Sequence, residues 1–282
     1  MALEVYDAFG DWKRARQGAD PTTHVAFVPT MGALHQGHAD LIRRAQQEVG
    51  PSGHVVVSIY VNPTQFNDAA DFEAYPNTRD VDLRMAESAG ADAVVFPQPQ
   101  ELYPGGVPQR VAPVDYGGLT ALWEAAHRPG HFDGVVAVVR ALFRQVEPNR
   151  AYFGEKDWQQ LAVVSELVRR EFPDLTIVPV PTRREEDGLA MSSRNVRLNE
   201  VERKVAPMLN GALGALAEAT NTMMEAQRQL NRLQEAGWSV EYLAVVDAET
   251  LDPDPEFGRE CRAIGAAHLG GVRLIDNVPV PN

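Results

Sequence analysis

The stretch His24-Val25-Ala26-Phe27-Val28-Pro29-Thr30, followed directly by Met31-Gly32-Ala33-Leu34-His35-Gln36-Gly37-His38, decides the fold. Its first half is a short apolar run, which predicts a strand. Ala39 to Val49 then places apolar residues at helical spacing, and His54 to Val61 is a β-branched run that predicts a strand buried on both faces. Strand, helix and strand in this order predict a βαβ crossover in a parallel sheet.

The same alternation continues toward the middle of the chain. Further helices are predicted at Arg79 to Gly90, Val135 to Val146 and Gln159 to Arg170, and further strands at Ala93 to Phe96, Arg150 to Phe153 and Leu175 to Val180. Repeated units of this kind build an open sheet with helices on both faces. We therefore predict an α/β fold, a doubly wound, Rossmann-like parallel sheet.

The pattern changes after Val180. Pro181, a charged stretch from Arg183 to Asp187 and Gly188 interrupt the alternation, which indicates a hinge. We therefore predict a first domain of residues 1–181 and a smaller α+β domain of residues 182–282 that closes over the ligand. The smaller domain is expected to hold a helical stretch and three strands, at Val201 to Ala236, Val240 to Val246, Arg262 to His268 and Arg273 to Asp276.

Composition limits the class of protein. Of 282 residues, 44% are hydrophobic and 23% charged, as in ordinary globular proteins, and no apolar run is long enough to span a bilayer. The acidic residues near the amino terminus do not fit an export signal. The single cysteine, Cys261, cannot form an internal disulfide, so we expect a cytoplasmic protein in which this side chain is buried. We expect no membrane partner.

The net charge is −13, which argues against a nucleic-acid partner because such proteins need a basic surface. A small phosphate ligand needs only a local positive pocket, so the charge does not exclude nucleotides.

The first motif, Met31–His38, suits an anionic ligand. Gly32 and Gly37 let a base or a phosphate approach the backbone, and a helix beginning near Gly37 presents free N–H groups. His35 and His38 can donate hydrogen bonds to charge that develops on a departing pyrophosphate. Taken alone, the pair could equally be two ordinary histidines, and zinc is disfavoured because further ligands at the usual spacing are missing.

Two other motifs carry groups that bind oxyanions. The second motif, Met191-Ser192-Ser193-Arg194-Asn195, supplies hydroxyls and a guanidinium, although an isolated sequence of this kind often only caps a helix. Phe153-Gly154-Glu155-Lys156-Asp157 follows a strand, so it lies at the edge of the sheet where α/β folds bind ligands. Lys156 suits a phosphate and Asp157 a ribose hydroxyl, although this sequence could also be an ordinary helix start. The three motifs together favour a site that cleaves ATP.

These residues resemble the pantothenate synthetases, the pantoate–β-alanine ligases of the HIGH-signature nucleotidyltransferase superfamily. The similarity covers nearly the whole chain. Short signatures such as the first motif are shared with aminoacyl-tRNA synthetases and cytidylyltransferases. The segments Asn62–Phe66 and Phe153–Gln160 are more particular to the family. The matching segments are Pro29–His35, Tyr60–Phe66, Tyr75-Pro76, Arg128–Phe132, Phe153–Gln160, Asp187–Asn195 and Arg273–Asn277.

The resemblance implies a reaction in two steps. The pantoate carboxylate attacks the α-phosphorus of ATP and pyrophosphate leaves. The amine of β-alanine then displaces AMP from the pantoyl adenylate. The acyl phosphate is already activated, so no enzyme nucleophile is needed and the protein mainly positions the reactants. The implied partners are ATP, pantoate, β-alanine and Mg²⁺, with Asp82 as a candidate outer ligand of the metal and no protein metal site. Family members tend to be homodimers.

The resemblance also implies roles for individual residues. The catalytic candidates are His35, His38, Lys156 and Arg194. Gln65 and Gln160 resemble the pair that grips pantoate, and His131 is expected at the β-alanine pocket; composition alone would make such a loop glutamine solvent-facing. The expected ATP-binding residues are Met31, Gly32, Ala33, Leu34, His35, Gln36, Gly37, His38, Gly154, Glu155, Lys156, Asp157, Arg183, Met191, Ser192, Ser193 and Arg194.

Two positions depart from the family pattern. Arg183 stands where the family usually has an apolar residue whose backbone contacts adenine, and Gln36 replaces an acidic residue in the first motif. Arginine can stack on a base, and its charge could alter nucleotide preference.

Two other classes of function remain open. A nucleotidyltransferase would leave the nucleotide on its product and release no AMP. A silent nucleotide-binding protein is disfavoured by the complete set of motifs, and a tRNA synthetase by the length and acidity of the chain.

Overall fold

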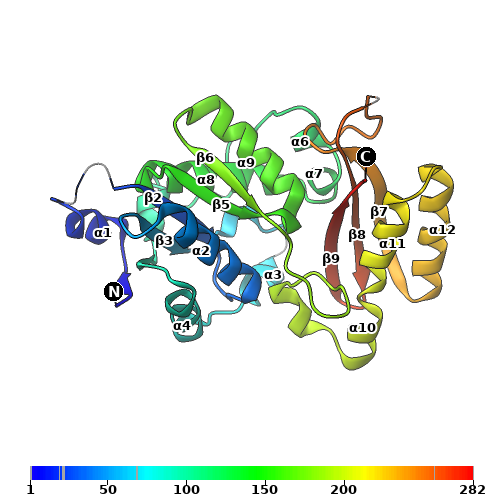
Figure 1. The fold of residues 1–282 in the computed structure, drawn as a ribbon, viewed down its shortest axis with the longest axis horizontal. Coiled ribbons are helices and arrows are strands. Elements are labelled where there is room, and N and C mark those ends of the chain that lie inside the picture. The colour runs from blue at the N-terminus through cyan, green and yellow to red at the C-terminus, as the bar shows by residue number, and fades with distance from the viewer. Residues whose placement is uncertain (1, 19, 21–22, 68, 257, 282) are drawn as a thin grey trace. The chain divides into compact units, whose positions relative to one another are not determined.

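A computed structural model describes residues 2–18, 20, 23–67, 69–256 and 258–281 of the chain (Figure 1). Its contacts divide the chain into two compact units. The first unit comprises residues 1–115, 128–155 and 163–181, and the second comprises residues 116–127, 156–162 and 182–282. The predicted boundary after residue 181 is one of the breaks between the units. The prediction did not include the two short segments, 116–127 and 156–162, that group with the second unit.

The first unit is built on a six-stranded sheet in the order β1-β4-β3-β2-β5-β6, and every neighbouring pair of strands is parallel. The chain winds outward from β2 in one direction through β3 and in the other through β5. This confirms the predicted doubly wound α/β sheet. The strands are β1 (Glu4–Tyr6), β2 (Val25–Thr30), β3 (His54–Ile59), β4 (Ala93–Val95), β5 (Arg150–Gly154) and β6 (Thr176–Val180).

The topology places a ligand-binding edge in this sheet. The winding direction reverses between β2 and β5, which pair through Ala26 and Phe27 with Arg150 and Ala151. In open α/β sheets ligands bind outside the carboxyl ends of the strands at such a reversal. Here those ends are Thr30, directly before the first motif, and Gly154.

Helices cover both faces of this sheet. Side chains alternate along β2, so Ala26 and Val28 pack in the cluster beneath helix α2, whereas the ring of Phe27 meets the ring of Phe143 of α8. The helical elements of this unit are α1 (Phe9–Ala15), α2 (Gln36–Val49), η1 (Pro63–Gln65), α3 (Ala69–Glu73), α4 (Arg79–Ala89), α5 (Pro99–Leu102), α8 (His131–Val146) and the part of α9 (Trp158–Glu171) from residue 163 onward. The 3₁₀ turn η2 (Glu155–Asp157) contains one of the breaks between the units, and residues 158–162 of α9 group with the second unit.

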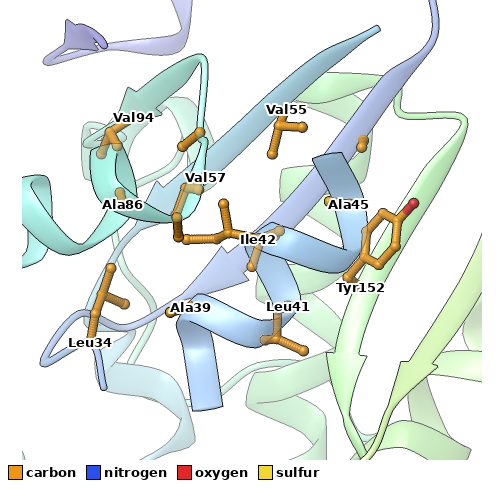
Figure 2. Close-up of a cluster of buried hydrophobic side chains, with 14 of the residues drawn as sticks. Leu34, Ala39, Leu41, Ile42, Ala45, Val55, Val57, Ala86, Val94 and Tyr152 are labelled. Atoms are coloured by element: carbon orange, nitrogen blue, oxygen red, sulfur yellow. The ribbon is translucent and has the colours of Figure 1, made fainter. Parts of the chain in front are cut away.

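Helix α2 is fixed to the sheet by an apolar face. Ala39, Ile42 and Ala45 follow one another along this face and are completely buried, and they pack against Val55 and Val57 of β3 (Figure 2). The helix begins at Gln36, one residue before the predicted start near Gly37, so Gly37 and His38 belong to its first turn. The packing therefore holds the end of the first motif rigidly at the edge of the sheet.

The second unit is α+β, as predicted, and contains an antiparallel sheet in the order β7-β8-β9. Leu209, Leu213 and Leu216 of α11 are buried in the core against it. The predicted helical stretch Val201 to Ala236 is three helices, with Pro207 between the first two. The elements of this unit are α6 (Gly118–Ala121), α7 (Glu124–His127), η3 (Ser193–Arg197), α10 (Glu200–Val205), α11 (Met208–Ala217), α12 (Thr222–Glu235), β7 (Trp238–Asp247), β8 (Cys261–Leu269) and β9 (Val272–Pro279).

Two expectations about single features are settled by the fold. The side chain of Cys261 was predicted to be buried but is only half-buried. The reason is its position at the start of the strand β8, near the end of the sheet. Within the described ranges, no helix has the length and apolar character needed to cross a membrane.

Candidate functional site

The first motif begins with a turn that a buried carboxylate holds in shape. Asp82 of α4 is 2% exposed, and its two oxygens accept hydrogen bonds from the backbone N–H groups of Ala33 (3.1 Å) and Leu34 (2.7 Å). Gly32 and Ala33 both have positive φ, +83° and +49°. A Cβ at residue 32 would lie 3.0 Å from Asp82 Oδ2, so the turn requires glycine there. The backbone is therefore preorganised for a close ligand.

The two histidines of the first motif form a reciprocal cap at the start of α2. His35 Nδ1 accepts a hydrogen bond from the N–H of Gly37 (3.1 Å), and His38 Nδ1 accepts one from the N–H of His35 (3.2 Å). Their ring centroids are 4.2 Å apart. In a neutral imidazole whose Nδ1 accepts, the proton is on Nε2. Each ring is thus set to act as an N–H donor at Nε2, beside the positive end of a helix.

Gln65 lies next to the first motif in the same unit. It is 9% exposed, its Nε2 donates to the sulfur of Met31 (3.0 Å), and its Oε1 accepts from Asn62 Nδ2 (3.1 Å). Asn62 follows the strand β3 and is 1% exposed. The structure therefore brings Gln65 and Met31, two of the predicted site residues, together.

His131 is held within the same group of residues. It is 6% exposed; Nδ1 lies 2.8 Å from the carbonyl oxygen of Gln65, and Nε2 lies 3.0 Å from Arg128 Nη1. A guanidinium can only donate, so Nε2 accepts and Nδ1 carries the proton that is donated to Gln65. Both ring nitrogens thus serve to hold Gln65 and Arg128.

Lys156 is fixed through its backbone in the second unit. Its carbonyl oxygen accepts from Asn277 Nδ2 (3.0 Å), and its Nζ lies 3.7 Å from Asp157 Oδ1. Gly154 and Glu155, predicted to act with it, are the end of β5 and the start of η2 in the chain.

The two consecutive glutamines of α9 have different environments. Gln159 is 6% exposed, donates to the carbonyl oxygens of Leu119 and Leu122, and accepts from the N–H of Glu124. Gln160 is half-buried and is not used in these bonds. Gln159 is therefore structural, whereas Gln160, the residue predicted to contact pantoate, takes no part in these bonds.

The second motif follows a short hairpin that is anchored to β9. Arg184 pairs with Ala190 across the hairpin, and the N–H of Met191 donates to the carbonyl oxygen of Arg183 (2.9 Å). The guanidinium of Arg184 donates to both oxygens of Asp276, at 2.7 and 3.0 Å. Asp276 is 5% exposed. This two-bond ion pair fixes the backbone that leads into the motif.

The motif itself is a capped 3₁₀ turn. Ser192 Oγ accepts from the N–H of Arg194 (3.2 Å), and the side-chain amide of Asn195 donates to the carbonyl oxygen of Ala190 (3.0 Å). Ser192 is thus the capping residue that the sequence allowed. Ser192 and Asn195 line one small cavity together with Lys156 and Asp276. The structure therefore brings Lys156 and the second motif together.

The predicted residues thus fall into two groups. The first unit carries Met31–His38, Gln65, His131, Gly154 and Glu155, and the second unit carries Lys156, Asp157, Gln160, Arg183 and Met191–Arg194. No role was predicted for Asn62, Arg184 or Asp276, and Asp82 was predicted only as an outer ligand of a metal. Asn62 and Asp276 lie within segments that carry the family resemblance, but only burial and hydrogen-bond partners reveal what each residue holds.

Comparisons with known proteins agree over almost the whole chain. A family model described as pantoate-beta-alanine ligase matches residues 4–279. The chain is 47% identical over 268 residues to the pantothenate synthetase of Rubrobacter xylanophilus, with 91% of each chain covered. It is 46% identical over 280 residues to that of Bdellovibrio bacteriovorus, with 99% of each covered.

Solved structures give the same result. The crystal structure of pantothenate synthetase from Thermus thermophilus matches with a TM-score of 0.87 and 42% identity, covering 98% of this chain and 99% of that one. The pantoate-beta-alanine ligase of Francisella tularensis, solved in complex with beta-gamma ATP and β-alanine, matches with a TM-score of 0.82 and 32% identity, covering 99% and 98%.

Proposed function

The chain belongs to the pantoate–β-alanine ligase family, and we propose that it joins pantoate to β-alanine through a pantoyl adenylate. It is an ATP-dependent ligase that forms an amide bond. The observation that supports the proposed route is the histidine pair, because two imidazoles with their protons on Nε2 suit a charge that grows on a leaving pyrophosphate.

The first step forms the adenylate. A carboxylate oxygen of pantoate attacks the α-phosphorus of ATP, and the bond between that phosphorus and the bridging oxygen to the β-phosphate breaks. The electron pair leaves with pyrophosphate. We assign His35 and His38 as donors to the phosphate oxygens, with Lys156 and Arg194 as the cations that neutralise the developing charge.

The second step forms the amide. The amine of β-alanine attacks the acyl carbon of the adenylate and loses a proton, and the bond from that carbon to the phosphate oxygen breaks, which releases AMP. This step needs positioning rather than an enzyme nucleophile. We assign Gln65 and Gln160 to pantoate. We assign His131 to the β-alanine pocket. Its hydrogen bonds to Gln65 and Arg128 would hold these two residues there.

We propose that ATP is bound by both motifs and the segment after β5. The turn held by Asp82 lets the nucleotide approach its backbone at Gly32, and Ser192 and Ser193 contact the triphosphate. The proposed ATP-binding residues are Met31, Gly32, Ala33, Leu34, His35, Gln36, Gly37, His38, Gly154, Glu155, Lys156, Asp157, Arg183, Met191, Ser192, Ser193 and Arg194.

Mg²⁺ would accompany the triphosphate. When bound, it would neutralise phosphate charge. Asp82 already accepts hydrogen bonds from Ala33, Leu34 and the Thr78 hydroxyl, which suits an outer position beside an ion held mainly by phosphate and water. Asp82 supports the turn and would contact the ion only through water.

Isotope exchange between pyrophosphate and ATP tests this route. Labelled pyrophosphate should enter ATP when pantoate is present without β-alanine, because adenylate formation is reversible. Addition of β-alanine should then release AMP. An exchange that requires β-alanine would contradict the two-step route, and a product that keeps the nucleotide would indicate a nucleotidyltransferase.

We also propose a cytoplasmic homodimer. The cytoplasm supplies ATP, and its reducing environment suits a chain with one cysteine. The dimer is proposed from the resemblance to a family whose members tend to be homodimers. Light scattering after size-exclusion chromatography should give twice the chain mass of 31.0 kDa. A mass equal to one chain at micromolar concentration would contradict the dimer.

A further inference from the structure

A buried network of polar side chains lies behind Gln65 in the first unit. Tyr103 and Asn62 are 8% and 1% exposed. The hydroxyl of Tyr103 donates to Asn62 Oδ1 (2.8 Å), and Thr64 Oγ1 donates to the same oxygen (3.1 Å). Asn62 Nδ2 donates to the carbonyl oxygen of Gly134 (3.2 Å) and to Gln65 Oε1 (3.1 Å). Both lone pairs and both protons of the Asn62 amide are thus used.

The network fixes which atom Gln65 offers to a ligand. The Gly134 carbonyl can only accept, so the atom of Asn62 that faces it is the nitrogen. The second proton of that nitrogen points at Gln65, so the facing atom there is the acceptor Oε1. The amide nitrogen of Gln65 therefore points the other way, toward Met31 of the first motif. Gln65 therefore presents its N–H groups as donors, and its side-chain amide cannot rotate by 180° without breaking the buried hydrogen bond to Asn62.

Close backbone packing keeps the network in place. A Cβ at residue 134 would lie 2.3 Å from the carbonyl oxygen of Thr64, so only glycine lets α8 approach η1 closely enough for its carbonyl to reach Asn62. Asn62 is thus held from two sides, by the carbonyl of α8 and by the Tyr103 hydroxyl that follows α5.

We propose that Tyr103 is a positioning residue for pantoate: through Asn62 it holds Gln65 as a hydrogen-bond donor, so the substrate must place an oxygen acceptor there. This rests on the proposed assignment of Gln65 to pantoate. Tyr103 does not touch the substrate. Its hydroxyl polarises and orients the Asn62 amide, which in turn fixes the Gln65 amide.

The test is steady-state kinetics of Tyr103→Phe, with each substrate varied in turn. Loss of the hydroxyl should raise the pantoate KM roughly five- to tenfold, the effect of one hydrogen bond. The KM values for ATP and β-alanine should stay within about twofold. The matched control is Tyr152→Phe, which deletes a hydroxyl from a fully buried tyrosine of the same unit whose bond goes to Glu48. It should leave the pantoate KM unchanged.

A double-mutant cycle separates positioning from a general structural effect. If Tyr103 acts through Gln65, Tyr103→Phe should have no further effect on the pantoate KM in a Gln65→Ala enzyme. An equal effect in both backgrounds, or an unchanged pantoate KM in Tyr103→Phe, would overturn the proposal. An unchanged pantoate KM in Gln65→Ala would instead refute the assignment of Gln65 itself.

A second variant covers the case in which Tyr103→Phe fails to fold. Thr64→Val removes the other donor to the same Asn62 oxygen, whereas Thr64→Ser retains it. The valine variant should raise the pantoate KM severalfold and the serine variant should not. Equal values for the two would overturn the proposal.

Discussion

At the scale of single residues, the hydrogen bonds of His35 and His38 define their chemistry. Both use Nδ1 to cap α2, so both keep a proton on Nε2. An imidazole fixed in this way needs no reorientation as charge develops in the transition state.

Replacing His38 should therefore affect catalysis more than binding. His38→Ala should lower kcat roughly 10²-fold or more, with a smaller change in the ATP KM, because the donor acts mainly in the transition state. The control His24→Ala removes an imidazole just before β2, outside the first motif, and should leave kcat unchanged. Normal turnover of His38→Ala would exclude it from the mechanism.

The carboxylate of Asp82 holds the turn of the first motif in shape by accepting two backbone hydrogen bonds. Asp82→Asn keeps the size of the side chain but places an amide N–H against a backbone N–H of Ala33 or Leu34, where two donors then face each other. We expect the ATP KM to rise about tenfold or more, since a buried donor without an acceptor costs roughly 1–3 kcal/mol. Equal ATP KM values for variant and wild type would contradict this role.

The first motif could be recognised from the sequence because glycines and histidines follow a strand at a fixed spacing. The supporting residues could not. Asp82 is 49 positions away from Ala33 in the chain, and Tyr103 is 41 positions from Asn62, so neither pairing leaves a local pattern. Likewise, only the bonds of Gln159 show which of two adjacent glutamines is structural.

At the scale of elements, the hairpin before the second motif depends on its ion pair with β9. Asp276→Asn should destabilise the protein by about 3 kcal/mol and raise the ATP KM, because it leaves the Arg184 charge poorly compensated at a buried anchor. The control is Arg203→Ala, which breaks an exposed ion pair with Asp187 of the same hairpin and should cost less than about 1 kcal/mol. Chemical denaturation measures both; equal losses would contradict the anchoring role.

The elements with strong periodicity were predicted to within a few residues, as for α8 and β5. Of the two three-residue strands, β4 was predicted but β1 was not. β1 has only three residues, and its pairing with β4 depends on contacts more than 85 positions away, which no local pattern encodes. The stretch from Val201 to Ala236 was predicted to be helical, but its division into three helices was not. Pro207 and Asn221 create new helix starts within an otherwise helical composition.

At the scale of the whole molecule, carboxylates paired with arginines make the stability of the protein fall at acid pH. The Arg169 guanidinium lowers the pKa of Glu166 to about 2, and hydrogen bonds from Arg140, Arg203 and Arg259 lower the pKa values of Glu171, Asp187 and Asp247. Unfolded carboxyls ionise near pH 4. A depressed pKa stabilises the fold above that pH, and the contribution is lost as the pH falls toward about 2. The free energy of unfolding should therefore decline between about pH 4 and 2.

The contribution of one carboxylate can be measured at Asp247. It is 3% exposed and accepts hydrogen bonds from Arg259 and from the N–H groups of Glu249 and Thr250. Asp247→Asn should lower the free energy of unfolding at pH 7 by about 1–3 kcal/mol. Urea denaturation should show this difference shrinking toward pH 2. A difference that stays constant from pH 7 down to pH 2 would contradict the charge-based explanation.

The division of the chain has a consequence for its evolution and engineering. Arg273 of β9 pairs with Glu124 at 2.6 and 2.8 Å, and Tyr242 of β7 donates to the same carboxylate, yet Glu124 belongs to a segment more than 50 residues before the stretch that begins at residue 182. A fragment of residues 182–282 would therefore lack a piece of its own interior. A gene fusion or recombination event at residue 182 would separate Arg273 and Tyr242 from their partner Glu124.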